Sequence, residues 1–201
     1  MHRCPNDVIR QPAERHPSID AKRSDSGKRT MIDSRNLFHY NVKYCFYRKG
    51  HIMGQASLAS AVFYRDPWAA IDFLEKAFGF ERTMVISDAD GALAHSQLGF
   101  GDGYIMVGSE WADYTASPAS IGGKNSQTVH VNLDCDIDAH CSQARAAGAA
   151  IEQEPADQFY GDRTYRARDP EGHVWTFAQN KRPFSVEESE KATGLKIELF
   201  S

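Results

Sequence analysis

The stretch from Tyr160 to Phe177, YGDRTYRARDPEGHVWTF, gathers an aspartate, an arginine, a tyrosine and a histidine around one tight turn. Its histidine, His173, is of a type that ligates metals or acts as a general base near neutral pH. Two further histidines, His95 and His130, stand inside runs whose alternation is typical of strands. The chemistry open to these residues depends on the face of the sheet to which each side chain points.

The elements that must position these side chains follow one order twice. Asp66 and Pro67 predict the start of a helix, Gly79 predicts its end, and three strand-like runs follow. After the strand-like run QTVHVNLD, Asp136 predicts the start of a second helix, again followed by strands. We therefore expect an α+β fold of two βαβββ modules, at about residues 57–110 and 126–180.

The charge is distributed unevenly along the chain. Residues 1–55 hold 11 Lys and Arg against 5 Asp and Glu (+6), and residues 56–201 hold 12 against 22 (−10), which together give −4. The basic, aperiodic leader is predicted to be disordered or separate from the domain, residues 56–182 form the domain, and residues 183–201 form a polar tail. An acidic domain disfavours a nucleic-acid-binding surface.

Composition also bears on location and on the leader. No apolar run is long enough to cross a bilayer, and the 4 cysteines show no CxxC pairing, so we expect a cytoplasmic protein with no membrane partner. Composition changes sharply just before Met53, which favours Met53 as the true start of translation. The competing interpretation is a genuine basic tail that contacts a partner.

The repeated order, with YGDRTYRARDPEGHVWTFAQ closing the second module, resembles the vicinal oxygen chelate superfamily from about Ser57 to Asn180. That group includes glyoxalase I, extradiol dioxygenases and fosfomycin- and bleomycin-resistance proteins. The hairpin and the helix DIDAHCSQARAAGA look most like its PhnB-like branch. The resemblance implies curled sheets that form a cup with helices outside, completed within a homodimer.

Pairing across the Asp169–Gly172 turn is predicted to set Arg168 opposite His173 and Tyr165 opposite Thr176. Trp175 then faces the helices together with His173, which supports the hairpin rather than the site. The same alternation in the other strands selects a set of side chains for the cup. The predicted ligand-binding residues are Phe63, His95, Gln97, Tyr104, Met106, His130, Asn132, Arg163, Tyr165 and Thr176.

The metal positions of the superfamily are where this sequence departs from the pattern. Metal-dependent members that it resembles place His or Glu at four strand positions, which fall here on Ala59, Met106, Thr128 and Thr176. None of these offers an imidazole or carboxylate, so we expect no metal and no other cofactor, and metal-dependent glyoxalase or dioxygenase activity is disfavoured. A site built on His95 and His130 lacks the usual third ligand.

Two functions stay open at this point. One is a metal-free protein that binds a small molecule in a cup at a dimer interface, where Arg163 favours an anionic group or instead forms a structural ion pair. The other is an enzyme of the superfamily, either a metal-free acid/base catalyst using His130 or His95, or a metal-dependent lyase or dioxygenase if the predicted register is wrong. Both histidines could also lie on a solvated face.

Overall fold

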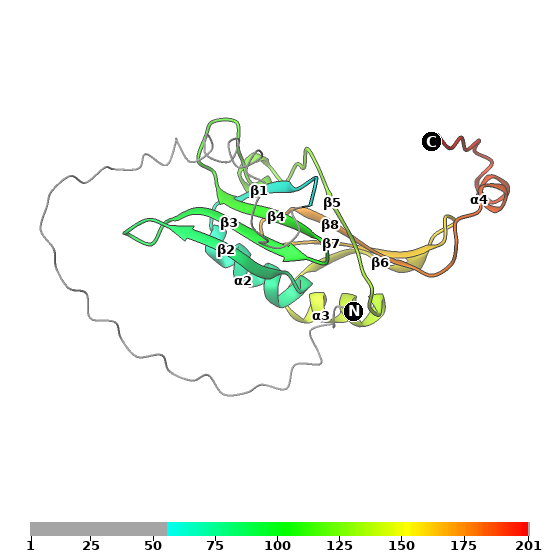
Figure 1. The fold of residues 1–201 in the computed structure, drawn as a ribbon, viewed down its shortest axis with the longest axis horizontal. Helices are drawn as coiled ribbons and strands as arrows, with labels where there is room; N and C mark the ends of the chain where they lie inside the picture. The colour runs from blue at the N-terminus through cyan, green and yellow to red at the C-terminus, as the bar shows by residue number, and fades with distance from the viewer. Residues whose placement is uncertain (1–55, 201) are drawn as a thin grey trace, which may run out of the picture. The chain divides into compact units, whose positions relative to one another are not determined.

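The computed structural model describes residues 56–200, and the predicted leader lies outside the described residues. Module 1 comprises β1 (Ser60–Tyr64), α2 (Pro67–Phe78), β2 (Glu81–Ser87), β3 (Leu93–Phe100) and β4 (Gly103–Ser109). Module 2 comprises β5 (Val129–Asn132), α3 (Ile137–Ala146), β6 (Ala150–Asp157), β7 (Asp162–Arg168) and β8 (Val174–Asn180). The 3-10 helix η3 (Pro118–Ile121) lies between the modules, and α4 (Val186–Thr193) follows β8 (Figure 1). The predicted α+β fold with a repeated βαβββ order is confirmed.

Each module forms its own four-stranded mixed sheet. The strand orders are β1-β4-β3-β2 and β5-β8-β7-β6, so the two sheets have the same topology. In each sheet the first strand runs parallel to the last, and the other neighbours are antiparallel. β1 and β2 are therefore the edge strands of the first sheet, and β5 and β6 are those of the second.

Both long helices begin where the capping residues predict. The Asp66 carboxylate accepts a hydrogen bond from the Ala69 amide at 3.0 Å, and Asp136 accepts one from Ala139 at 2.9 Å. These caps satisfy amides that have no partner inside the helix. Gly79, at φ 76°, ends α2 in the left-handed conformation that glycine adopts without strain.

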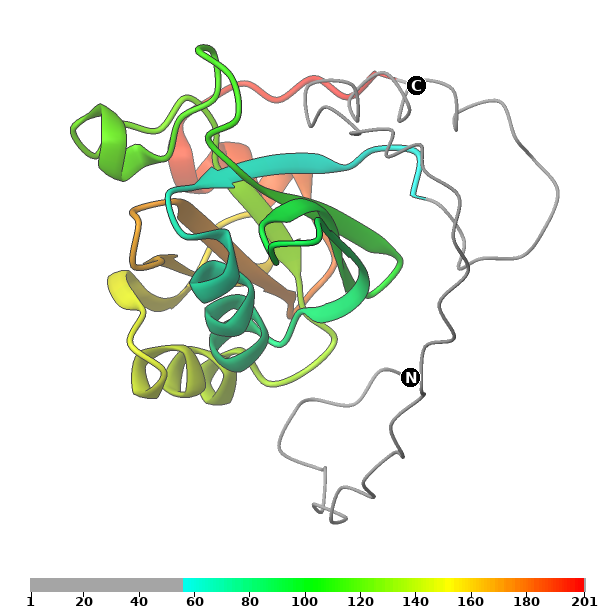
Figure 2. The same ribbon diagram turned by 90° about the vertical axis from the view of Figure 1, so that its left-hand side faces the viewer.

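The helices α2 and α3 lie side by side on the same side of the two sheets (Figures 1 and 2). Phe78 at the end of α2 is fully buried, and its ring lies 5.5 Å from that of Trp175 and 4.9 Å from that of Phe177, both in β8. The last residue of the module 1 helix thus packs on the sheet of module 2, whereas the helix itself lies against α3 and the strands of module 1. The two modules share one hydrophobic core.

A buried histidine of α3 links the modules by hydrogen bonds. His140 Nε2 lies 3.1 Å from the Phe78 carbonyl oxygen, and its Nδ1 lies 2.6 Å from the Tyr165 hydroxyl. Because a carbonyl can only accept, Nε2 carries the proton and Nδ1 accepts from Tyr165. Burial lowers the pKa of His140 and raises that of Tyr165, so both side chains are held neutral.

The β7–β8 hairpin differs from its predicted register by one residue. Arg168 pairs with Val174 and Tyr165 with Phe177, so that Asp169 stands opposite His173 and donates its amide to the His173 carbonyl. The loop therefore holds three residues, with Gly172 at φ 92° in its last position. A type I turn followed by a left-handed residue is a common three-residue hairpin loop, and it shifts every pair relative to a four-residue loop.

Candidate functional site

Each sheet has one face against the helices, here called the helix-packed face, and an opposite face, here called the open face. On the helix-packed face of module 1 lie Leu98, Ile105 and Val107, all buried as the alternation predicts. The neighbours of these residues along each strand point the other way. The open faces are therefore where side chains remain free to meet a ligand.

The open face of module 1 is largely apolar. The β-ladders place Met84 beside Gln97, Gln97 beside Met106, and Ala61 beside Met106, in one row across all four strands. Further members of the same face are Phe63, Ile86, His95 and Tyr104. All these side chains are half-buried or exposed, so the face is accessible in the single chain.

His95 is the polar exception on this face. Its ring nitrogen Nε2 is buried and has no hydrogen-bond partner within residues 56–200. Ile86 stands directly across from it on β2. Burial lowers the pKa of His95, which favours the neutral imidazole at pH 7. A buried polar atom without a partner is uncommon in folded proteins and calls for an explanation.

The open face of module 2 is polar. The ladders place Gln153 beside Arg166, Arg166 beside Thr176, and Thr176 beside His130, again in one row across four strands. Asn132 lies on the same face, next to Ala178. Arg166 was missed by the sequence analysis, because the one-residue register error assigned it to the helix-packed face.

The same one-residue register error placed two residues, Tyr165 and Arg163, on the wrong face of the sheet. Tyr165 is fully buried, and its ring stacks 4.9 Å from that of Phe177. Arg163 bonds the Asp138 carboxylate with two nitrogens, at 2.8 and 2.9 Å, and Asp157 at 3.0 Å. The structural ion pair left open for Arg163 is the observed arrangement, and the prediction that both residues face the cup is wrong.

The turn of the hairpin serves the fold. The Asp169 carboxylate accepts hydrogen bonds from the Tyr64 hydroxyl at 2.7 Å and from the Trp175 indole at 3.0 Å. His173 is buried, and its Nε2 lies 2.8 Å from the Phe63 carbonyl oxygen, which fixes this nitrogen as a donor. Glu171 accepts from the amides of Arg65 and Asp66. The turn thus holds β1 and the start of α2 against module 2.

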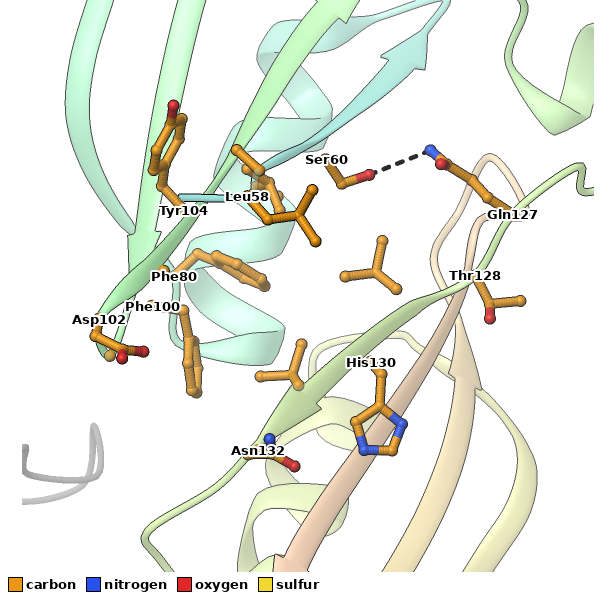
Figure 3. Close-up of a pocket in the computed structure, with 16 residues that line it drawn as sticks. Leu58, Ser60, Phe80, Phe100, Asp102, Tyr104, Gln127, Thr128, His130 and Asn132 are labelled. Atoms are coloured by element: carbon orange, nitrogen blue, oxygen red, sulfur yellow. Dashed lines mark hydrogen bonds between the residues drawn. The ribbon is translucent and has the colours of Figure 1, made fainter. Parts of the chain in front are cut away.

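A crevice with a volume of about 530 Å³ lies between the two modules. Figure 3 shows Phe80 directed from module 1 into this space, whereas the ring of His130 is directed away from it, on the far side of β5. Of the predicted site residues, Tyr104, His130 and Asn132 line the crevice, and the other seven do not. Ile105 and Val131 of the helix-packed faces line the crevice as well, so the ten predicted site residues do not converge in one cavity.

A second pocket, of about 430 Å³, lies beside β1. Phe63 and Ala61 form one side of it, and the segment 114–127 with His173 forms the other. Gln127 holds that segment to β1, because its side-chain amide donates to the Ala61 carbonyl at 3.0 Å. Among the predicted site residues, Phe63 is the one that lines this pocket.

The four residues at the positions that the resemblance implies for a metal offer no imidazole or carboxylate. Those positions are Ala59, just before β1, Met106 in β4, Thr128, just before β5, and Thr176 in β8. The ladders place Ala61 beside Met106 and His130 beside Thr176, which adds one imidazole and no carboxylate. Nowhere in residues 56–200 do three His, Cys, Asp or Glu side chains gather closely enough to hold an ion.

Comparisons with known proteins find the following similar sequences and structures. An uncharacterized protein of Mycobacterium bovis is 31% identical over 131 residues, which is 63% of this chain and 85% of that protein. The crystal structure of TioX from Micromonospora sp. ML1 is 36% identical, covers 62% of this chain and 98% of its own, and superposes with a TM-score of 0.52. TnmS3, an antibiotic binding protein from Streptomyces sp. CB03234, is 19% identical over 67% of this chain and 99% of its own, with a TM-score of 0.49.

None of the helices within residues 56–200 is long and apolar enough to cross a membrane.

The family model that matches residues 50–177 is that of the Glyoxalase/Bleomycin resistance protein/Dioxygenase superfamily. This match spans both βαβββ modules apart from the last residues of β8. The chain therefore belongs to the Glyoxalase/Bleomycin resistance protein/Dioxygenase superfamily.

Proposed function

We propose that this protein binds an amphipathic organic molecule on its open sheet faces, without a metal ion and as a cytoplasmic homodimer. The observation that carries the proposal is His95 Nε2, a buried atom with no partner within the described residues, on the apolar open face of module 1. A ligand donor or acceptor placed against this nitrogen would supply the missing hydrogen bond. The surrounding methionine and aromatic side chains would take the apolar part of the same molecule.

We propose that the second protomer of the homodimer covers β2. Every residue of β2 is exposed, including three consecutive apolar side chains, Met84, Val85 and Ile86. An unpaired edge strand that is apolar on both faces is a surface on which chains associate. Because Met84 and Ile86 continue the open face that holds His95, a second copy seated there would also wall the site. The finer assignment to the PhnB-like branch stays a prediction.

Light scattering on the full chain tests the dimer. Ile86→Lys is expected to give a monomer at micromolar concentration, because a charge on this strand opposes burial of the edge. Leu199→Lys is the matched control, since Leu199 is also an exposed apolar residue but lies in the segment after α4. A monomeric wild type, or equal effects of the two substitutions, contradicts this part of the proposal.

The experiment for the binding site is a thermal-shift screen of drug-sized organic molecules on the full chain. A ligand that binds only the folded state at 100 times its Kd stabilises it by about 2.7 kcal/mol. His95→Phe should abolish the shift while leaving the free protein as stable or more stable, because it removes a polar atom that had no partner. Arg145→Gln, on the outer surface of α3, is the control and should respond like the wild type. A library without hits, or hits that His95→Phe still binds, contradicts the proposal.

An acid/base enzyme is the second candidate, and it rests on the lowered pKa of His95. A neutral imidazole at pH 7 can accept a proton from a bound substrate. If the protein is such an enzyme, some compounds found by the thermal-shift screen are substrates that it converts. The turnover of these substrates should fall as pH drops through the pKa of His95. Mass spectrometry of each hit after incubation separates this function from simple binding.

A further inference from the structure

Four polar side chains form a continuous row across the open face of module 2. Gln153, Arg166, Thr176 and His130 are neighbours in successive β-ladders, from one edge strand, β6, to the other, β5. None of the four side chains makes a hydrogen bond or ion pair within residues 56–200. Their hydrogen-bonding groups are thus aligned by the backbone and left for an external partner.

Arg166 stands apart from the other arginines of the described chain. Six of them form an ion pair with an Asp or Glu: Arg65, Arg82, Arg145, Arg163, Arg168 and Arg182. Residues 56–201 hold 22 acidic against 12 basic residues, so carboxylates are plentiful around it. Arg166 lies in the middle of the central strand β7, and none of these carboxylates in the described residues neutralises it. It is therefore an unpaired cation in an acidic domain.

The immediate neighbours of Arg166 keep this charge unopposed. Gln153 and Thr176 flank it across the sheet, and both are uncharged. Along the strand on the same face lie Thr164 and Arg168, and Arg168 is neutralised by Glu152 at 2.7 Å. An anion that approaches this face meets the Arg166 guanidinium with no carboxylate beside it in the ladders.

We propose that this row is an anion subsite, in which Arg166 binds a carboxylate or phosphate group of the organic ligand. A guanidinium presents paired N–H donors that match the two oxygens of such a group. Adjacent strands are about 4.8 Å apart, so Arg166 and His130 stand roughly 10 Å apart at their backbones, with the Thr176 hydroxyl between them. The oxyanion lies over Thr176, and His130 contacts the next part of the molecule.

This inference rests on the proposed function, because it names the ligand class of the same protein, but it concerns a different face from His95. The test uses two probes of equal shape, 2-naphthoate and 2-naphthamide, with inorganic phosphate as a third. Binding to the full chain is measured by calorimetry and by the NMR signal of the arginine Nε–H groups. Wild type is expected to bind 2-naphthoate at least about ten-fold more tightly than 2-naphthamide, with a saturable shift of the Arg166 signal.

Arg166→Gln should make the two naphthalene probes equal, and Arg166→Lys should restore part of the preference, since a lysine keeps the charge but not the paired donors. Arg163→Gln is the matched control, because Arg163 is on the same strand but bonds Asp138 and Asp157. It should keep the preference for 2-naphthoate. Raising the salt concentration should weaken 2-naphthoate binding and leave 2-naphthamide unchanged.

The inference is overturned if 2-naphthoate and 2-naphthamide bind wild type equally, if neither binds, or if Arg166→Gln keeps the preference. Binding of inorganic phosphate without 2-naphthoate overturns it as well, because the site would then take a free ion rather than an organic ligand. The proposed function fails separately. It fails when no neutral or charged compound of the wider screen gives a shift that depends on His95.

Discussion

Truncation of Trp175 to alanine gives a stability prediction whose size follows from the contacts of its side chain. The indole is fully buried, lies 5.5 Å from the ring of Phe78 and 5.6 Å from that of Phe80, and donates to Asp169 at 3.0 Å. Removing a buried tryptophan costs about 3–5 kcal/mol in lost burial and cavity formation. The Asp169 oxygen that loses the indole keeps the Tyr64 hydroxyl at 2.7 Å, so no carboxylate oxygen is orphaned. We therefore expect a loss of about 4 kcal/mol.

Urea unfolding followed by far-ultraviolet circular dichroism measures this loss without relying on tryptophan fluorescence. All variants are compared at one protein concentration, because dimerisation would make stability concentration-dependent. Trp175→Phe is the matched control, since it keeps an aromatic ring in the core and loses the indole hydrogen bond with part of the ring, so its cost should be smaller than that of Trp175→Ala. A loss below about 2 kcal/mol for Trp175→Ala would refute the packing of β8 under the helices.

Three further predictions concern other parts of the chain. The unfolding free energy should fall as pH drops below about 6.5, because the pKa values of His140 and His95 are both lowered in the fold and the unfolded chain takes these protons first. Each histidine contributes at most about 1.4 kcal/mol per pH unit, and His140→Gln should remove its own share of the slope in urea titrations from pH 7.5 to 5. Gly161→Ala should cost about 2–4 kcal/mol by the same assay, since Gly161 has φ 102° and a Cβ there would lie 2.5 Å from the Arg182 carbonyl oxygen, whereas Gly122→Ala, at φ 70° with open space, should cost clearly less. A chain that starts at Met53 should melt like the full chain in calorimetry, and a loss of several degrees would favour a leader that docks on the domain.

The helices and their buried faces were predictable from the sequence because local chemistry specifies them. Asp66, Pro67 and Gly79 are the residues that helix ends prefer, and each acts as predicted. Alternation likewise identified Leu98 and Ile105 as core residues, since a two-residue period fixes the face once one strand partner is known.

The hairpin shows where the same reasoning failed. The turn residues were identified, but the loop was counted as four residues rather than three, and this moved Tyr165 to the open face and Arg166 away from it. The available signal was the combination of Pro170 as the first loop residue and Gly172 in a left-handed position, which is typical of a three-residue loop.

The crevice and the unpartnered nitrogen could not be predicted because both depend on tertiary packing. Phe80 and Val131 belong to different modules, yet both line the same crevice. The burial of His95 Nε2 depends on the strands and side chains that surround it, and no local pattern encodes that. Strand alternation predicts the face of the sheet on which a residue lies. How deeply its side chain is buried depends on the tertiary packing around that face.

The central claim, that the open sheet faces bind an organic ligand, is tested most directly by mapping a bound hit from the screen with NMR chemical-shift perturbation on the full chain. The account predicts that the perturbed signals cluster on the open faces, around His95, Gln97 and Met106 in module 1 and around Arg166 and Thr176 in module 2. Signals confined to the crevice around Phe80 and Val131, or to the outer surfaces of α2 and α3, would contradict it.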